Sequence, residues 1–372
     1  MDFSLTAEQD DAAALARAIL TDRCTQERLR EVEAGEDRFD RDLWKQLGDA
    51  GLLGLSLPEN LGGAGYGLLE LSSVVIEAGR AVAPVPLAWH AVTAMALAEF
   101  GSDAQKQAWV PAAAAGDNVL TSALSEDRGD APERPTVSAE RGSDGWRITG
   151  AKTVVPSGAV ADLFVVPADT AEGVTVFLVR PDDVGVSVER QRVGDGDSTA
   201  RLELTNVLGG DDRVLGVAGQ GTELTRWLTA RLTVGLCALQ LGVAEGALEL
   251  TSKYAGTREQ FGRPIGTFQA VSQRLADGYI DLQGIRLTLW QAAWRLSEGL
   301  PADIEVATAK LWAADAGHRI AHTTVHVHGG VGIDLDGGAH RYFTAAKRIE
   351  FTLGGATEQA RVIGRALAAE PA

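Results

Sequence analysis

One stretch of the chain, residues 258–269, combines a side chain suited to binding an anion with residues that fix a turn. Arg258 carries a planar guanidinium, whose paired N–H groups match two oxygens of a phosphate. Gly262, Pro264 and Gly266 follow, and these residue types are typical of turns with a defined conformation. We therefore expect the turn to hold Arg258 in a fixed direction for contact with a phosphate group. The alternative is a helix hairpin on which Arg258 is a solvated surface charge.

Two long helices are expected to position this turn. Residues 226–254 form a helical pattern rich in Leu, Ala and Thr. After the turn, apolar residues recur at alternating steps of four and three, which places them on one face of a helix. These residues are Val271, Leu275, Gly278, Leu282, Ile285, Leu289, Ala292 and Leu296. The pattern predicts a helix that packs in a bundle, with the turn at its start.

The pattern of apolar residues changes twice along the chain. Helical spacing up to about residue 100 gives way to short alternating or β-branched runs, which predict strands. The runs are residues 146–149, 163–166, 174–179 and 202–204. No long helix interrupts them, so a small antiparallel β-domain is expected. The predicted α+β organisation is a helical domain (residues 1–118), a middle β-domain (119–217) and a C-terminal helical bundle (218–372).

The composition argues against a nucleic-acid partner and a membrane span. The 372 residues include 34 basic and 51 acidic side chains, for a formal charge of −17. A surface this acidic repels phosphate backbones, so an anionic ligand needs a locally basic pocket. The N-terminus lacks the features of a signal peptide, and no uninterrupted apolar run of about 18 residues is present. Cys24 and Cys237 form no Cys-x-x-Cys pair, and we expect a cytoplasmic protein.

Several known cofactor and metal motifs are missing from the sequence, which excludes some classes of binding site. The chain has no Gly-x-Gly-x-x-Gly between a strand and a helix, and no Gly-x-x-x-x-Gly-Lys-Ser/Thr, so neither a Rossmann fold nor a P-loop is expected. His326 and His328 form a His-x-His pair without a third ligand at suitable spacing. No metal site is predicted.

The order of helical, β and helical regions, together with three motifs, resembles the acyl-CoA dehydrogenase family. Residues 58–65 match the family's Pro-Glu-x-x-Gly-Gly-x-Gly motif, and residues 104–111 resemble its link into the middle domain. The turn matches the family's Arg-x-x-Phe-Gly-x-x-Ile-x-x-x-Gln motif at Arg258, Phe261, Gly262, Ile265 and Gln269. The resemblance covers nearly the whole chain. It implies the family's fold and its activity, the FAD-dependent α,β-desaturation of acyl-CoA thioesters.

The resemblance also implies which residues contact FAD. In the family, the loop that corresponds to residues 258–269 crosses a subunit interface and grips the FAD of the neighbouring chain. Residues 326–332 resemble the Gln-x-x-Gly-Gly-x-Gly loop at the adenine side, with His326 in place of the glutamine. Residues 124–130 resemble the family's Thr-Glu-Pro-x-x-Gly-Ser segment, in which Ser125 keeps a hydroxyl. The predicted cofactor-binding residues are Arg258, Gln260, Phe261, Gln269, His326, Gly329, Gly330 and Ser125.

The groups that the family uses for proton abstraction are missing. The family pairs one glutamate with the flavin, because the α-proton of a thioester needs a base. Alignment places Leu353 or Gly354 at one known position of that glutamate and Ala230, before Arg231, at the other. None of these can accept a proton, so no catalytic residue is predicted. In the middle domain, Val154-Val155-Pro156 replaces the family's Trp-Ile-Thr beside the flavin, and Asp130 falls near its serine.

The retained and missing groups together predict a chain that works beside an unlike partner. It is similar to subunits of heteromeric actinobacterial acyl-CoA dehydrogenases for steroid side-chain CoA thioesters, where one subunit type supplies the glutamate. We expect an α2β2 assembly with a homologous, Glu-bearing partner, an acyl-CoA substrate and an electron-transfer flavoprotein as electron acceptor. One alternative is a homotetramer that uses Glu350 or Glu358 as a displaced base. Another is a non-catalytic acyl-CoA-binding scaffold of the same fold.

Overall fold

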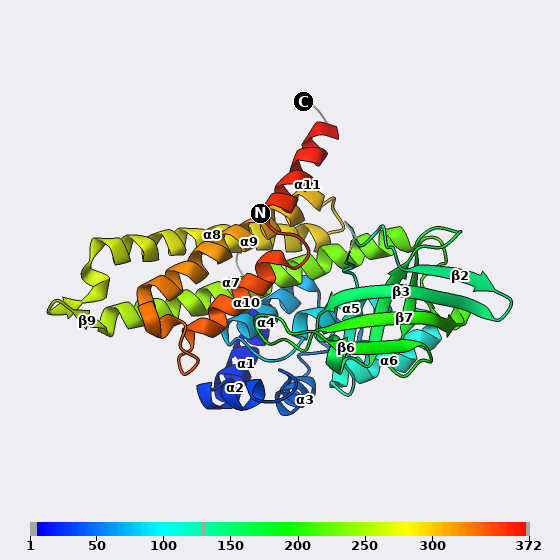
Figure 1. The fold of residues 1–372 in the computed structure, drawn as a ribbon, viewed down its shortest axis with the longest axis horizontal. Helices are drawn as coiled ribbons and strands as arrows, with labels where there is room; N and C mark the ends of the chain where they lie inside the picture. The colour runs from blue at the N-terminus through cyan, green and yellow to red at the C-terminus, as the bar shows by residue number, and fades with distance from the viewer. Residues whose placement is uncertain (1–5, 128–130, 370–372) are drawn as a thin grey trace. The chain divides into compact units, whose positions relative to one another are not determined.

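Helical regions flank a β region along the chain (Figure 1). The computed structural model describes residues 6–127 and 131–369. Its internal contacts divide it into two compact units. The bundle unit comprises Met1–Arg28, Leu68–Ala83 and Thr233–Ala372, and the sheet unit comprises Leu29–Gly67 and Pro84–Leu232. The expected fold class is confirmed, while the domain boundaries at residues 118 and 217 stay predictions.

The bundle unit consists of helices that bury apolar faces against one another. It contains α1 (Ala7–Arg23), α4 (Leu68–Arg80), most of α7 (Gly221–Thr257), α8 (Gln269–Ser297), α9 (Asp303–His328), α10 (Ala339–Phe351) and α11 (Ala356–Ala369). The predicted apolar stripe lies on α8 and is buried from Gly278 to Ala292. A Cβ atom at Gly242 of α7 would lie 1.8 Å from the carbonyl oxygen of Ile76 on α4. The absent side chain therefore lets the backbones of the two helices meet.

One helix, α7, has the length and composition of a membrane span. It runs for 37 residues, longer than the predicted residues 226–254, and an 18-residue window has a mean hydropathy of 1.3. Of that window, 72% is buried inside the structure. A core helix passes the same test, and we interpret α7 as one. The absence of an uninterrupted apolar run led us to expect no span, whereas the mean hydropathy of a window that includes polar residues passes the test.

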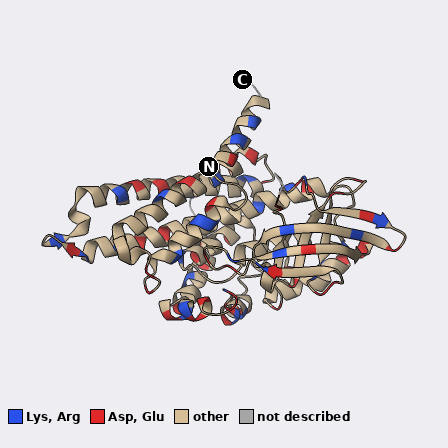
Figure 2. Cartoon of the chain, in the orientation of Figure 1, with Lys and Arg blue, Asp and Glu red and all other residues tan. Residues whose placement is uncertain are grey.

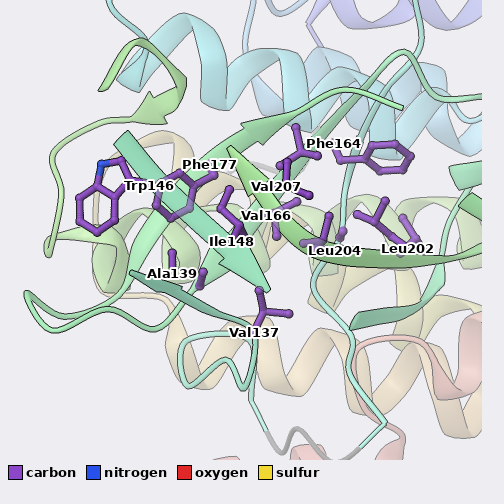
Figure 3. Packing of buried hydrophobic residues seen from close by; sticks show 14 of the residues in the cluster. Val137, Ala139, Trp146, Ile148, Phe164, Val166, Phe177, Leu202, Leu204 and Val207 are labelled. Carbon is purple, nitrogen blue, oxygen red and sulfur yellow. The ribbon is translucent and has the colours of Figure 1, made fainter. Parts of the chain in front are cut away.

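In the sheet unit, two four-stranded sheets share one apolar core (Figure 3). One sheet has the order β1 (Leu120–Ser122), β4 (Leu163–Ala168), β5 (Thr175–Val179), β8 (Val214–Leu215). The other has the order β2 (Ser138–Gly142), β3 (Gly145–Val155), β7 (Ala200–Gly209), β6 (Val186–Arg190). Ile148 and Leu202 from the second sheet join Phe164 and Phe177 from the first in one buried cluster. The same unit contains α3 (Arg41–Asp49), α5 (Leu87–Phe100) and α6 (Asp103–Ala115), and α2 (Gln26–Glu33) spans the boundary between the units.

The four predicted runs of β residues coincide with parts of β3, β4, β5 and β7, except that the run 174–179 begins one residue before β5. Within these sheets β1 pairs with β4 in parallel, and the other pairings are antiparallel. The parallel pair is possible because β1 and β4 are far apart in sequence. Their connection includes the β2–β3 hairpin of the other sheet.

Candidate functional site

The predicted turn is a β-hairpin that joins α7 to α8 at one end of the bundle unit (Figure 1). β9 (Glu259–Gln260) pairs in antiparallel with β10 (Arg263–Pro264). Phe261 and Gly262 connect them with φ of 55° and 77°, as in the two-residue turns that suit hairpins. A left-handed φ is strained for a bulky residue such as Phe261, whose surface is 93% exposed. The hairpin thus presents an aromatic ring to its surroundings.

Backbone hydrogen bonds fix Arg258 at the base of this hairpin. Its N–H donates to the carbonyl oxygen of Tyr254 at 2.8 Å, and its own carbonyl accepts from the N–H of Ile265 at 2.8 Å. The guanidinium is exposed and has no hydrogen-bond or ion-pair partner among residues 6–127 and 131–369. Gln260 turns its amide back onto the carbonyl of Glu259 at 2.8 Å, and Gln269 is the exposed first residue of α8. The hairpin carries both basic and acidic residues (Figure 2).

A second segment lies next to this hairpin. α9 ends at His328, and the 3-10 helix η5 (Gly329–Gly332) follows. The ring of His328 stacks on that of Tyr254 with centroids 4.3 Å apart, which brings the end of α9 to the end of α7. His326 is exposed, and a Cβ atom at Gly329 or Gly330 would meet nothing within 4 Å. Apart from Ser125, the predicted cofactor-binding residues therefore lie on two segments at one end of the bundle unit. Tyr254, which links them, was not predicted, although it precedes Arg258 by one helical turn.

Ser125 belongs to the sheet unit, just beyond β1. It is exposed, and its carbonyl oxygen accepts from the N–H of Thr153 at 2.9 Å. Asp130, which the sequence places near the family's serine, lies outside the described residues.

Val154, which the alignment matched to a tryptophan of the family, adopts a strained conformation. Its φ is 50°, it is 44% exposed, and it lies within an irregularity of β3 between Lys152 and Val155. Its N–H donates to Oε1 of Gln191 at 2.7 Å. A left-handed β-branched residue is rare, and such residues cluster at functional sites.

The residues that the alignment placed at the family's base have side chains without a proton acceptor. Leu353 and Gly354, with φ of 56° and 92°, form the turn between α10 and α11. In the sheet unit, Ala230 precedes Arg231, whose guanidinium carbon lies 3.9 Å from the centre of the Trp227 ring. Burial lowers the pKa of the Arg231 guanidinium to about 10, although the negative charge of Glu99 opposes this shift.

Both candidate substitute bases are engaged within the bundle unit. Glu350 accepts from Nζ of Lys347 at 2.6 Å, and Nδ1 of His318 lies 3.1 Å from the same carboxylate. Oε2 of Glu358 accepts from the N–H of Gly355 at 3.1 Å. Each carboxylate thus accepts at least one hydrogen bond from its own chain.

Comparison with known proteins gives a consistent result over the whole chain. Family models match three parts of the chain. The model of the acyl-CoA dehydrogenase N-terminal domain matches residues 6–117, that of the middle domain matches 121–207, and that of the C-terminal domain matches 219–368. Acyl-CoA dehydrogenase FadE27 of Mycobacterium tuberculosis is 49% identical over 381 residues, covering 100% of both chains.

Solved structures agree with this assignment. A chain of the ChsE4-ChsE5 complex from Mycobacterium tuberculosis matches with a TM-score of 0.95 and 50% identity over 100% of both chains. A Tcur3481-Tcur3483 steroid ACAD variant matches with a TM-score of 0.91 and 42% identity over 97% of this chain and 98% of that one. A glutaryl-CoA dehydrogenase of Mycobacterium smegmatis in complex with FADH2 matches with a TM-score of 0.90 and 25% identity over 99% and 96%. The chain therefore belongs to the acyl-CoA dehydrogenase family of oxidoreductases, which act on CH–CH bonds.

Proposed function

We propose that this chain is the subunit without a base in an FAD-dependent acyl-CoA dehydrogenase of two unlike subunit types, assembled as α2β2. It contributes binding groups to a flavin whose proton-abstracting glutamate belongs to the partner. The observation with the most weight is a contrast within the bundle unit. The Arg258 guanidinium is available to a ligand, whereas the sequence alignment puts Leu353 or Gly354, neither of which accepts a proton, at the position of the base.

The residues at the end of the bundle unit fit the chemistry of FAD. Arg258 offers a guanidinium suited to the diphosphate, and Phe261 offers an exposed aromatic face. His326 and Gln269 are exposed polar side chains, and the open space at Gly329 and Gly330 lets a ligand approach the backbone. FAD, when bound, supplies the acceptor for the hydride that leaves Cβ of the acyl group. Because the chain as a whole carries a net charge of −17, the unpaired guanidinium of Arg258 provides local positive charge that can bind an anion.

The missing base is the reason to infer an unlike partner. Removal of the α-proton needs a carboxylate near the substrate, and Glu350 and Glu358 are held by groups of this chain. Two of the similar structures, ChsE4-ChsE5 and Tcur3481-Tcur3483, are named as pairs of chains, which supports a heteromer. The second is described as a steroid ACAD, which supports a steroid side-chain or similarly bulky acyl-CoA as substrate. An electron-transfer flavoprotein as acceptor follows from the family resemblance.

Co-expression tests the proposal. The chain is purified alone and together with a homologous acyl-CoA dehydrogenase chain that carries the glutamate, and flavin absorbance and acyl-CoA-dependent bleaching are recorded. We expect flavin and activity in the mixed complex only. A yellow, active homomer supports the displaced-base alternative, and absence of flavin from both preparations supports the scaffold.

Variants within the complex separate the sources of flavin binding and of the base. Arg258→Ala removes charge-assisted hydrogen bonds worth about 1.5–3 kcal/mol, so FAD affinity should fall about 10- to 150-fold. Arg274→Ala, an exposed arginine on α8, is the matched control and should leave FAD affinity unchanged. Glu350→Gln and Glu358→Gln should keep kcat, because the base is assigned to the partner.

A further inference from the structure

The C-terminal end of α10 is fastened by a lysine that lies inside the bundle unit. Lys310, on α9, is 0% exposed. Its Nζ donates to the carbonyl oxygen of Ile349 at 2.9 Å and to that of Glu350 at 3.1 Å. Both carbonyls belong to the last turn of α10, where a helix leaves carbonyl groups without intrahelical partners. The ammonium satisfies two of them and also meets the negative end of the helix dipole.

The turn that follows is held in an unusual conformation. Leu353 and Gly354 both have left-handed φ values, of 56° and 92°, and the leucine is strained there. Such a conformation persists only where the surroundings determine it. Further hydrogen bonds of the turn include Thr352 N to Arg348 O, Gly354 N to Phe351 O, Gly355 N to Glu358 Oε2 and Gln359 Nε2 to Leu353 O. Lys310 adds the two bonds that come from α9.

Burying this lysine is unfavourable. Burial lowers the pKa of Lys310 to about 8, although the negative charges of Glu350 and Glu358 oppose this shift. Burial also raises the pKa of the Cys237 thiol to about 12, so Cys237 carries no compensating charge at neutral pH. The carbonyl oxygens of Ile349 and Glu350 are the hydrogen-bond partners that hold this ammonium in the interior. The lysine therefore fixes the end of α10, where the α10–α11 turn begins.

We propose that Lys310 is a positioning residue, which holds residues 352–355 in place as one wall of the acyl-CoA site. This role rests on the proposed function, because that turn is assigned to the site through the match of Leu353 or Gly354 to the family's base position. Lys310 touches neither substrate nor flavin in this assignment. It acts through the backbone of α10.

Lys310→Met tests whether the two hydrogen bonds from Lys310 hold the end of α10, because methionine has a similar length but no hydrogen-bond donor. Hydrogen–deuterium exchange of a peptide covering residues 349–359 in the full chain reports on the turn without flavin, partner or substrate. We expect exchange to accelerate about tenfold, as the loss of charge-assisted hydrogen bonds implies. Lys347→Met is the control, since Lys347 lies on α10 but contacts Glu350 and His318 through their side chains. Unchanged exchange in Lys310→Met overturns the proposal.

Kinetics of the co-expressed complex test the positioning role. We expect Lys310→Met to raise KM for acyl-CoA by about threefold or more with kcat retained, and Lys310→Arg, which keeps N–H donors, to recover part of the loss. Faster exchange with a wild-type KM overturns the positioning role and leaves the proposed function intact. An inactive complex containing the wild-type chain contradicts the proposed function, while the exchange measurement still decides the fastening. If Lys310→Met fails to fold, the same measurements are made on Lys310→Gln, which keeps an amide donor but no charge. We then expect intermediate changes in the exchange rate and in KM.

Discussion

The ring of His328 stacks on the ring of Tyr254, with their planes inclined by 21°. Tyr254 lies one helical turn before Arg258, and His328 is the last residue of α9, next to Gly329. Nδ1 of His328 donates to the carbonyl oxygen of Thr324 at 2.8 Å, which fixes the plane of the ring. The stack therefore sets the spacing between the hairpin and the η5 segment, the two parts of the proposed FAD site in the bundle unit.

Removal of the Tyr254 ring should loosen this spacing. Aromatic pairs contribute about 0.5–1.5 kcal/mol beyond their buried area, so Tyr254→Ala should weaken FAD binding by about 2- to 10-fold in the mixed complex. Tyr254→Phe keeps the ring and should stay within about twofold of wild type. Fluorescence titration of the flavin-free complex with FAD measures both. Equal losses in the two variants would show that the hydroxyl, and not the stack, matters.

Replacement of Phe261 by asparagine should raise the stability of the chain but weaken its binding of flavin. A strained left-handed residue costs on the order of 1–3 kcal/mol, and asparagine tolerates this conformation better than phenylalanine. Phe261→Asn should therefore raise the unfolding free energy of the isolated chain by about 1 kcal/mol. It also removes an exposed ring whose burial against a ligand is worth about 1.5–3 kcal/mol, so flavin retention in the complex should fall at least tenfold. Thermal unfolding measures the predicted gain in stability, and the ratio of flavin to protein absorbance measures the predicted loss of flavin. A variant that loses stability but keeps its full flavin content would contradict both predictions.

In the sheet unit, Lys152 and Glu126 form a buried ion pair with Nζ and Oε1 2.5 Å apart. The two side chains are 0% and 3% exposed. Burial alone would raise the pKa of Glu126, but hydrogen bonds from Lys152 and Thr136 hold it below its usual range. Lys152→Met leaves the carboxylate without its counter-charge, although the N–H groups of Thr136 and Val137 still donate to it, and should destabilise the chain by about 3 kcal/mol.

The double variant Lys152→Met with Glu126→Gln removes both charges and is the matched control for this pair. It should lose clearly less stability than Lys152→Met alone, because no unpaired carboxylate remains. Urea unfolding of the two variants and the wild type gives the comparison. A double variant as unstable as the single one would mean that the lost packing of Lys152, and not the unpaired charge, causes the effect.

Local patterns predicted much of the fold but not the contacts between distant segments. The stripe on α8 and the runs in β3, β4, β5 and β7 follow from periodicity, since each depends on neighbours in sequence. Lysine is rarely buried, so nothing in the sequence marks Lys310 as an interior residue. The engagement of Glu350 by His318 depends on packing between α9 and α10, which a single sequence does not reveal.

His90 should make stability sensitive to acid. It is completely buried on α5, its Nε2 lies 3.1 Å from the carbonyl oxygen of Ala113, and its Nδ1 accepts from the N–H of Leu120 at 3.0 Å. Because the Leu120 N–H can only donate, Nδ1 keeps its lone pair and Nε2 carries the proton, so the folded state needs the neutral ring. Burial lowers the pKa of His90 to about 4, even though the bond to Ala113 opposes the shift.

The sign of the pH effect follows from the order of the two pKa values of His90. The unfolded chain binds the proton near pH 6.5 and the folded chain only near 4, so stability present above pH 6.5 is lost as the pH falls towards 4. The loss from this group amounts to about 3 kcal/mol by pH 4. His90→Gln cannot titrate, so its unfolding free energy should be lower at pH 7 but should fall less steeply between pH 7 and 4.5. Urea unfolding across that range, with the exposed His326→Gln as control, measures the difference, and identical slopes for wild type and His90→Gln would rule out His90 as the source of acid sensitivity.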